Sequence, residues 1–188
     1  ILSLALLSQN VFAQQKIETT VTMQKSTKKE NQIVYQKGLL LKLSDFKGKP
    51  KPTENTVAMA YSGVSFEYKG NIKNGVMQLD IVVYALFDKS RSWCLKKAKN
   101  EWTLAHEQRH FDITAIAACA FLRELKTTQF TKDHFNEVLA LQRKYQQQNE
   151  EMQNQYDSET NHGINKEKQA EWNEKIVLLL AESNDCYE

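Results

Sequence analysis

The sequence has few residues that break regular structure, with 6 glycines and 2 prolines among 188 residues. This scarcity excludes a collagen-like or low-complexity chain. No apolar run approaches the ~18 residues that a membrane-spanning helix needs. A large excess of one charge is also lacking, because 25 Lys and Arg residues stand against 23 Asp and Glu residues. Nucleic-acid-binding proteins usually carry a basic stripe, so we expect no nucleic-acid partner.

The composition, with 41% hydrophobic and 26% charged residues, is typical of one globular domain. Residues 1–13 (ILSLALLSQNVFA) differ from the rest, because they combine a short apolar run with a small-residue cleavage site that ends at Ala13. The basic start of a secretory signal is absent, and a buried N-terminal strand is the alternative. We expect a signal-peptide remnant at 1–13, one domain at 14–188, and a secreted or periplasmic protein.

Cysteine is scarce, with three residues at positions 94, 119 and 186. An exported protein can form disulfides, and three thiols allow at most one internal bridge. We favour a bridge between Cys94 and Cys119, because both belong to one local unit. The alternative is three free thiols, with Cys119 as a small core residue.

Residues 57–88 carry the clearest strand pattern. Apolar and polar residues alternate over 64–69, as in a half-buried strand. Asn74-Gly75 then predicts a hairpin turn, because both residues tolerate positive φ. The following run, 76–87, is apolar on both faces, which predicts a central strand that is covered on both sides.

Helical periodicity replaces this pattern after Ser90. It predicts a helix over 92–127 with a break near Asn100, a second helix from Thr131 to about Gln155 with solvated polar last turns, and a final helix over 166–182. Strands before helices indicate an α+β fold. We expect an antiparallel or mixed sheet with a hairpin, followed by three or four helices.

The segment LAHEQRHFD contains the pattern His-Glu-x-x-His. At about 100° per residue, His106 and His110 lie on one face of a helix, about 40° apart. Two imidazoles in this arrangement bind one Zn²⁺, and Glu107 flanks the metal as the general base. Asp112 lies about 240° from His106, which predicts a capping or ion-pairing role.

Zinc in a catalytic site needs a third protein ligand. A polar loop is expected over 156–165, and His162 within it is the favoured ligand. Asp157 and Glu159 are the alternatives, and a group that does not bind the metal can accept the second N–H of a liganding histidine. We expect Tyr156 to donate a hydrogen bond to the developing oxyanion, and a half-buried packing role is the alternative.

The two motifs together resemble a bacterial family, the domain of unknown function number 922, whose members are described as predicted secreted zinc-dependent proteases. The resemblance covers about Leu43 to Ile176 and includes LSDFKG at 43–48 and Ser92-Trp93. It implies a zincin-like domain with metal binding by His106 and His110 and with Glu107 as the catalytic residue.

The resemblance also marks a second signature, YDSETNHG, which strengthens the choice of His162 as the third ligand. The marked positions are Tyr156, Asp157, Thr160, His162 and Gly163. This chain departs from the family pattern at Arg109, where many members carry glycine. The resemblance therefore leaves the fit around the metal open at this position.

The sequence therefore predicts a secreted zinc metallopeptidase that hydrolyses peptide bonds with Glu107 as the general base. Protein and cell-wall peptide both suit such a site as substrates. Two alternatives stay open. One is a zincin-like binding module without turnover, and the other is an exported structural or adaptor protein without metal.

Overall fold

A computed structural model describes residues 16–52 and 56–188. The signal-peptide prediction for 1–13 therefore lies outside the described residues. Within them, the strands are β1 (Ile17–Met23), β2 (Gln32–Val34), β3 (Ala58–Met59), β4 (Ser62–Lys73), β5 (Val76–Asp88) and β6 (Trp93–Cys94). The α-helices are α1 (Glu101–Thr127), α2 (His134–Thr160) and α3 (Lys166–Glu182), with short 3-10 turns at Leu43–Asp45, Lys96–Ala98 and Asn184–Cys186. The predicted α+β class is confirmed, with a mixed sheet and three described helices.

The predicted hairpin joins β4 to β5. Asn74 and Gly75 have φ values of 51° and 76°, and the pairing of Lys73 with Val76 closes a two-residue turn. Both residues tolerate this left-handed backbone, which matches the twist of the two strands.

Strand β5 is the centre of the sheet. It pairs with β4 along one edge, antiparallel over its whole length. Its other edge pairs first with β1, parallel, and then with β2, antiparallel. β3 and β6 form a separate two-stranded ladder near the start of α1.

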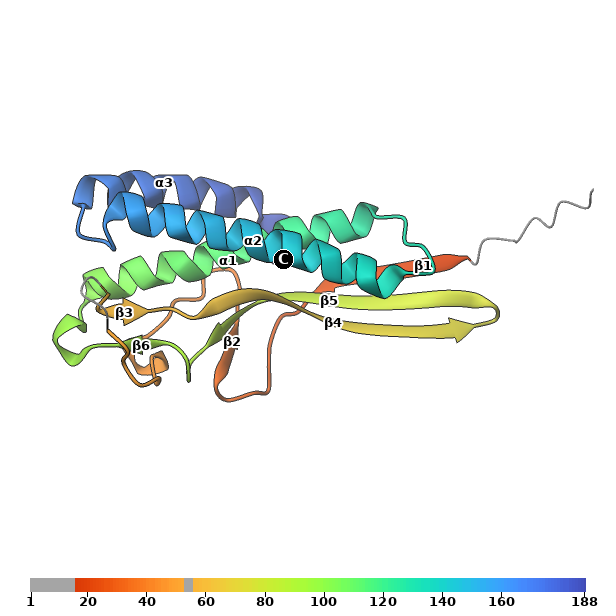
Figure 1. Ribbon diagram of the computed structural model, residues 1–188, viewed down its shortest axis with the longest axis horizontal. Helices are drawn as coiled ribbons and strands as arrows, with labels where there is room; N and C mark the ends of the chain where they lie inside the picture. The colour runs from red at the N-terminus through yellow and green to blue at the C-terminus, as the bar shows by residue number, and fades with distance from the viewer. Residues whose placement is uncertain (1–15, 53–55) are drawn as a thin grey trace, which may run out of the picture.

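The helices cover one face of the sheet only (Figure 1). Alternate residues of β5 point into the core, and Ile81, Val83 and Phe87 have no exposed surface. The residues between them, such as Val82 and Tyr84, are half-exposed. The prediction that this strand is covered on both sides is therefore wrong. Valine and tyrosine favour strands on a half-exposed face as well, so an apolar run does not require a second covering layer.

The prediction for the first helix is wrong at its beginning. Asn100 is the N-cap, and its side chain accepts a hydrogen bond from the Thr103 N–H at 2.9 Å. Residues 92–99 instead form β6 and a 3-10 turn. Ser92 joins this segment to the sheet, because its hydroxyl donates to the Asp88 carbonyl at 2.7 Å.

The second helix continues to Thr160, so the first half of the loop predicted over 156–165 is helical. It ends where Asn161 adopts a left-handed conformation with φ 49°. Its polar last turns are also not all solvated as predicted, since Asn149 is 2% exposed. The final helix is confirmed at Lys166–Glu182, with Trp172 and Ile176 buried as expected.

The disulfide joins Cys119 to Cys186, and Cys94 is a buried free thiol. The predicted Cys94–Cys119 bridge is therefore wrong. Cys94 lies in β6, whereas Cys119 lies on α1 beside the C-terminal 3-10 turn, close to Ser183. Proximity in the sequence did not place the first two cysteines together in space.

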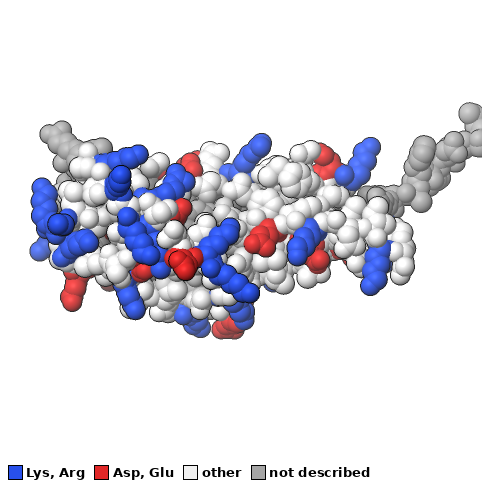
Figure 2. Space-filling view, turned by 90° about the horizontal axis from the view of Figure 1, so that it is seen from below, with Lys and Arg blue, Asp and Glu red and all other residues white. Residues whose placement is uncertain are grey.

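The face of the sheet that the helices leave uncovered carries many basic side chains, which are densest toward the end of the molecule with β3 and β6 (Figure 2). Two segments contribute exposed lysines there, namely Lys47, Lys49, Lys51, Lys96, Lys97 and Lys99. A membrane-spanning helix was not expected, and none of the described helices has the length and apolarity to cross a membrane.

Candidate metal centre

The His-Glu-x-x-His segment lies on α1. The predicted spacing brings His106 and His110 together on one face of this helix, 5% and 9% exposed. Their Nε2 atoms are 3.3 Å apart, and the two rings meet edge to face. The two imidazoles are thus enclosed between α1 and the neighbouring helices.

Asp157 on α2 is the third group that converges on this point. Its Oδ1 atom lies 3.1 Å from Nε2 of His106 and 3.1 Å from Nε2 of His110. Ligand atoms that surround zinc tetrahedrally at about 2.0–2.1 Å lie about 3.3 Å from one another. The three atoms therefore have the mutual spacing that a tetrahedral metal site requires.

Two glutamines fix the orientation of the imidazole rings. Nδ1 of His106 donates to the side-chain oxygen of Gln169 at 2.8 Å, and Nδ1 of His110 donates to that of Gln153. The amide nitrogens are engaged elsewhere, because Gln153 donates to the His110 carbonyl and Gln169 donates to the Tyr156 hydroxyl. Each ring therefore turns Nε2 toward Asp157, as a metal ligand must.

The charges at this point attract a cation. Burial acts to lower the pKa of His110, but the hydrogen bond to Asp157 and the charges of Glu107 and Asp157 outweigh it and raise the pKa to about 9. Burial acts to raise the pKa of Asp157, but its hydrogen bonds with His106 and His110 hold that pKa well below its usual range. The raised pKa means that His110 holds a proton strongly, and a metal ion at this point would compete with that proton for the imidazole nitrogen.

Glu107 lies beside the two histidines and is not one of the three converging groups. Its side chain is 4% exposed, and the Ala60 backbone N–H donates to the carboxylate. Within the described part of the chain, its Oε2 atom is one of two buried side-chain atoms without a hydrogen-bond partner. Burial raises the pKa of Glu107, and the nearby His110 and His106 oppose this shift. A buried carboxylate oxygen with no partner indicates a missing one, such as a water or a substrate group.

Tyr156 does not take the predicted position. It is fully buried, and its ring stacks on His106 with 4.7 Å between ring centroids. Its hydroxyl donates to the His106 carbonyl at 3.2 Å and accepts from Gln169 at 2.7 Å. The predicted oxyanion contact is therefore not supported, because the hydroxyl already has its partners within the protein and is absent from the pocket lining.

The three candidates for the third ligand lie on the last turn of α2, as Asp157 and Glu159 do, or just after it, as His162 does. His162 follows the helix with φ 52°. Its Nδ1 lies 3.4 Å from Oδ2 of Asp157, the carboxylate oxygen that is not the one between the two histidines. Glu159 accepts a hydrogen bond from the Trp172 indole at 2.8 Å and does not converge on the histidines. The distances favour Asp157 over His162, the ligand that the sequence favours.

The other residues of the second signature shape the wall behind His106. Gly163 has φ 81°, and a Cβ atom there would lie 3.1 Å from Nδ1 of His106. The Thr160 hydroxyl donates to the Tyr156 carbonyl at 2.7 Å. A glycine at position 163 thus allows the backbone to approach the imidazole closely.

Two polar residues of α1 face away from the converging atoms. Asp112 pairs with Arg109 at 2.8 Å and accepts from Gln108 at 2.9 Å, which confirms its predicted ion-pairing role. Arg109 also donates to Asn173 of α3 at 3.0 Å. Arg109, which stands where many members of the resembled family carry glycine, therefore does not line the pocket.

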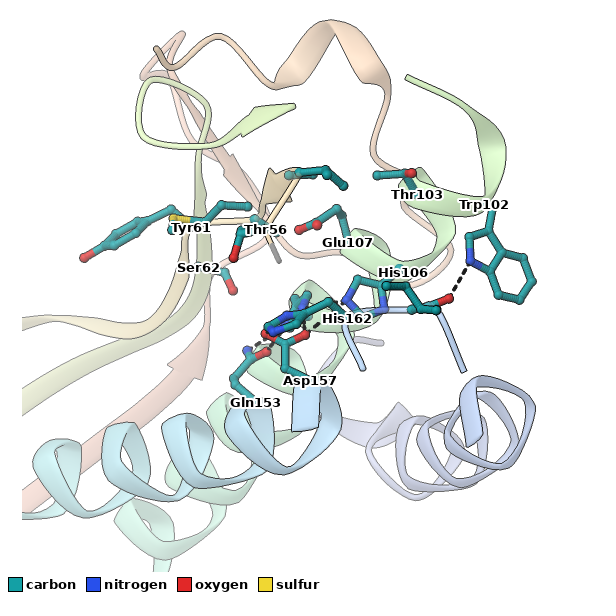
Figure 3. A pocket seen from close by; sticks show the side chains of 17 residues that line it. Thr56, Tyr61, Ser62, Trp102, Thr103, His106, Glu107, Gln153, Asp157 and His162 are labelled. Carbon is teal, nitrogen blue, oxygen red and sulfur yellow. Dashed lines mark hydrogen bonds and ion pairs between the residues drawn. The ribbon is translucent and has the colours of Figure 1, made fainter. Parts of the chain in front are cut away.

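The converging atoms lie at the base of a cavity of about 400 Å³ (Figure 3). One wall is the segment from Thr56 to Ser62, which includes β3. The opposite wall is formed by Trp102 and Thr103 at the start of α1 and by residues 162–164. The site is therefore open to a molecule larger than a water.

Comparisons with family models, with curated proteins and with solved structures find no match to this chain. The family resemblance thus stays an interpretation of the two motifs.

Replacing Gln153 or Gln169 with Leu is expected to weaken zinc affinity by about 10- to 100-fold, because the ring that each one orients loses its Nδ1 partner. Gln147→Leu is the control, since this exposed side chain of α2 donates to Glu151 and is absent from the pocket lining. Competition with a chromophoric chelator measures the affinities. Wild-type affinity in both variants would contradict the orienting role.

Proposed function

We propose that the protein is a zinc metallopeptidase with a zincin-like site. The observation that carries this proposal is the convergence of three donor atoms, two imidazole Nε2 and one carboxylate oxygen, beside the unpartnered oxygen of Glu107. His106, His110 and Asp157 are the proposed ligands. Their donor set, two histidines and one carboxylate, is one that catalytic zinc sites use.

A zinc ion held there supplies Lewis acidity, which polarises the scissile carbonyl and lowers the pKa of the attacking water. Glu107 is proposed to act as the general base, and its Oε2, which has no hydrogen-bond partner, supports this role. The same carboxyl group passes the proton to the leaving amine. Burial supports this second role, because it raises the pKa of Glu107.

The segment along the pocket offers the substrate a backbone edge. Among the described strands, β3 pairs with β6 alone, and this pairing uses one of its two edges. The segment that continues from β3 lines the cavity, and the Ala60 N–H already points to Glu107. An extended peptide is therefore proposed to lie along this edge by main-chain hydrogen bonds.

Secretion or a periplasmic location belongs to the same proposal. The Cys119–Cys186 bridge supports it, because disulfides persist in oxidising compartments. The apolar segment at 1–13 is the sequence feature that favours export.

Metal analysis of the purified protein tests this function first. We expect about one zinc per chain, because the site offers a single set of three converging histidine and carboxylate atoms. Chelation should abolish peptide hydrolysis, and zinc should restore it. A chain that binds no zinc would support the adaptor alternative, and a zinc-loaded chain that cleaves no peptide would support the inactive binding module.

A further inference from the structure

The rim of the candidate metal centre gathers large apolar side chains at the surface. Ten large hydrophobic residues are exposed in the described part of the chain, and half of them line this one cavity. They are Val57, Met59, Tyr61, Trp102 and Ile164. Exposed apolar patches on soluble proteins often mark interaction sites or ligand-binding grooves.

A hydrogen bond and a cation–π contact hold two of these side chains in place. The Trp102 indole N–H donates to the Gly163 carbonyl at 2.8 Å, and the side chain is still 46% exposed. The guanidinium of Arg91 lies 3.3 Å from the centre of the Tyr61 ring. Trp102 lies at the start of α1 and Ile164 follows α2, whereas Val57 and Met59 belong to the segment that includes β3. A preformed apolar rim loses little conformational entropy when a ligand binds.

Most of the side chains that line the cavity are uncharged. Among the described residues that line it, none is Lys or Arg. Its acidic residues are Glu107 and Asp157. Asp157 contacts both histidines, and Glu107 accepts from the Ala60 N–H while its Oε2 has no hydrogen-bond partner. The exposed lysines near this end of the molecule, such as Lys49 and Lys97, are absent from the lining.

We propose that the cavity takes an apolar stretch from the interior of a polypeptide, with bulky hydrophobic residues next to the bond to be cleaved. This inference rests on the proposed function, and it chooses between the two substrate classes that the sequence leaves open. Cell-wall stem peptides carry carboxylates and a free amine, and desolvating these groups without partners is costly. A free C-terminal carboxylate would find no Lys or Arg among the described lining residues.

Peptide binding to the Glu107→Gln variant tests this inference without turnover, in buffer that contains zinc. The probes are two fluorescent, end-blocked decapeptides, one with a central Leu-Phe pair and one with a central Asp-Glu pair, and a fluorescent muramyl stem peptide. Fluorescence anisotropy gives the dissociation constants. We expect the Leu-Phe peptide to bind at least about 10-fold more tightly than the other two, within the 10- to 200-fold range of an apolar pocket contact.

Rim variants in the same background locate the binding. Trp102→Ala and Ile164→Ser should each weaken binding of the Leu-Phe peptide by about 10-fold or more. Leu178→Ser is the matched control, because this side chain of α3 is 66% exposed and does not line the cavity. It should leave binding unchanged. Ile164 is 69% exposed, so its replacement tests the rim with little risk to folding.

Equal or tighter binding of the Asp-Glu or stem peptide would overturn the inference. So would binding of the Leu-Phe peptide that neither rim variant alters. Failure of the proposed function gives a different result, in which the Leu-Phe peptide binds with the expected rim dependence and the wild-type protein leaves it intact. Hydrolysis by the wild type with a preference for the acidic peptide would keep the function and refute the apolar substrate class.

Discussion

Glu107→Gln is expected to lower kcat/KM for peptide hydrolysis by about 10²- to 10⁴-fold, the usual contribution of a general base. The amide keeps the shape of the side chain and an oxygen that can accept from the Ala60 N–H. It cannot take a proton from water at neutral pH. Zinc content should stay at the wild-type value, because Glu107 is not one of the three converging groups.

Steady-state kinetics and metal analysis on the same preparation check both parts of this prediction. Glu101→Gln is the control, because Glu101 is an exposed glutamate at the start of the same helix. Equal rates for the wild type and Glu107→Gln would refute the catalytic role of Glu107. Loss of zinc from Glu107→Gln would instead indicate that this residue takes part in metal binding.

Asp157→Ala is expected to reduce zinc affinity by more than about 100-fold. Loss of a residue that only orients a ligand already costs about 10- to 100-fold, and loss of a direct ligand should cost more. Asp157 is the anionic donor of the three, and its Oδ1 lies 3.1 Å from both imidazoles. His162→Ala should reduce zinc affinity less than Asp157→Ala does, since its ring contacts the other oxygen of Asp157 and not the converging atoms.

Chelator competition on both variants distinguishes these two ligands. Glu159→Ala serves as the control, because its carboxylate is close in the sequence to Asp157 and bonds to Trp172. Zinc loss in His162→Ala with retention in Asp157→Ala would restore His162 as the third ligand. It would require the segment after α2 to move toward the histidines.

Local sequence rules were sufficient for part of the fold. The hairpin at Asn74-Gly75 and the helix from Lys166 to Glu182 occur where the sequence predicts them. Both depend on interactions between residues close along the chain. The turn needs positive φ at two neighbouring positions, and the helix needs a cap and a regular apolar stripe. The placement of His106 and His110 on one face is of the same kind, because it follows from the helical repeat.

The third partner of the two histidines did not follow from such rules. The polar composition of 156–165 predicts a loop, but α2 continues into this segment and ends at Thr160, with Asn161 as its C-cap. The helical stretch puts Gln153 and Asp157 one turn apart on the same helix, facing α1. Packing between helices thus decided which polar residues are buried, and a polar helix is hard to distinguish from a polar loop by composition alone.

The motif on α1, its helical conformation and the α+β class were determined by the sequence itself, since each depends on residues within a few turns of one another or on the order of strands and helices. The tertiary structure alone decided the partner of Cys119, the single covered face of the sheet, and the approach of Asp157 and Gln169 to the histidines. Those contacts join residues far apart in the sequence, up to 67 positions for the disulfide. They depend on how amphipathic faces pack together, and spacing along one chain does not specify that packing.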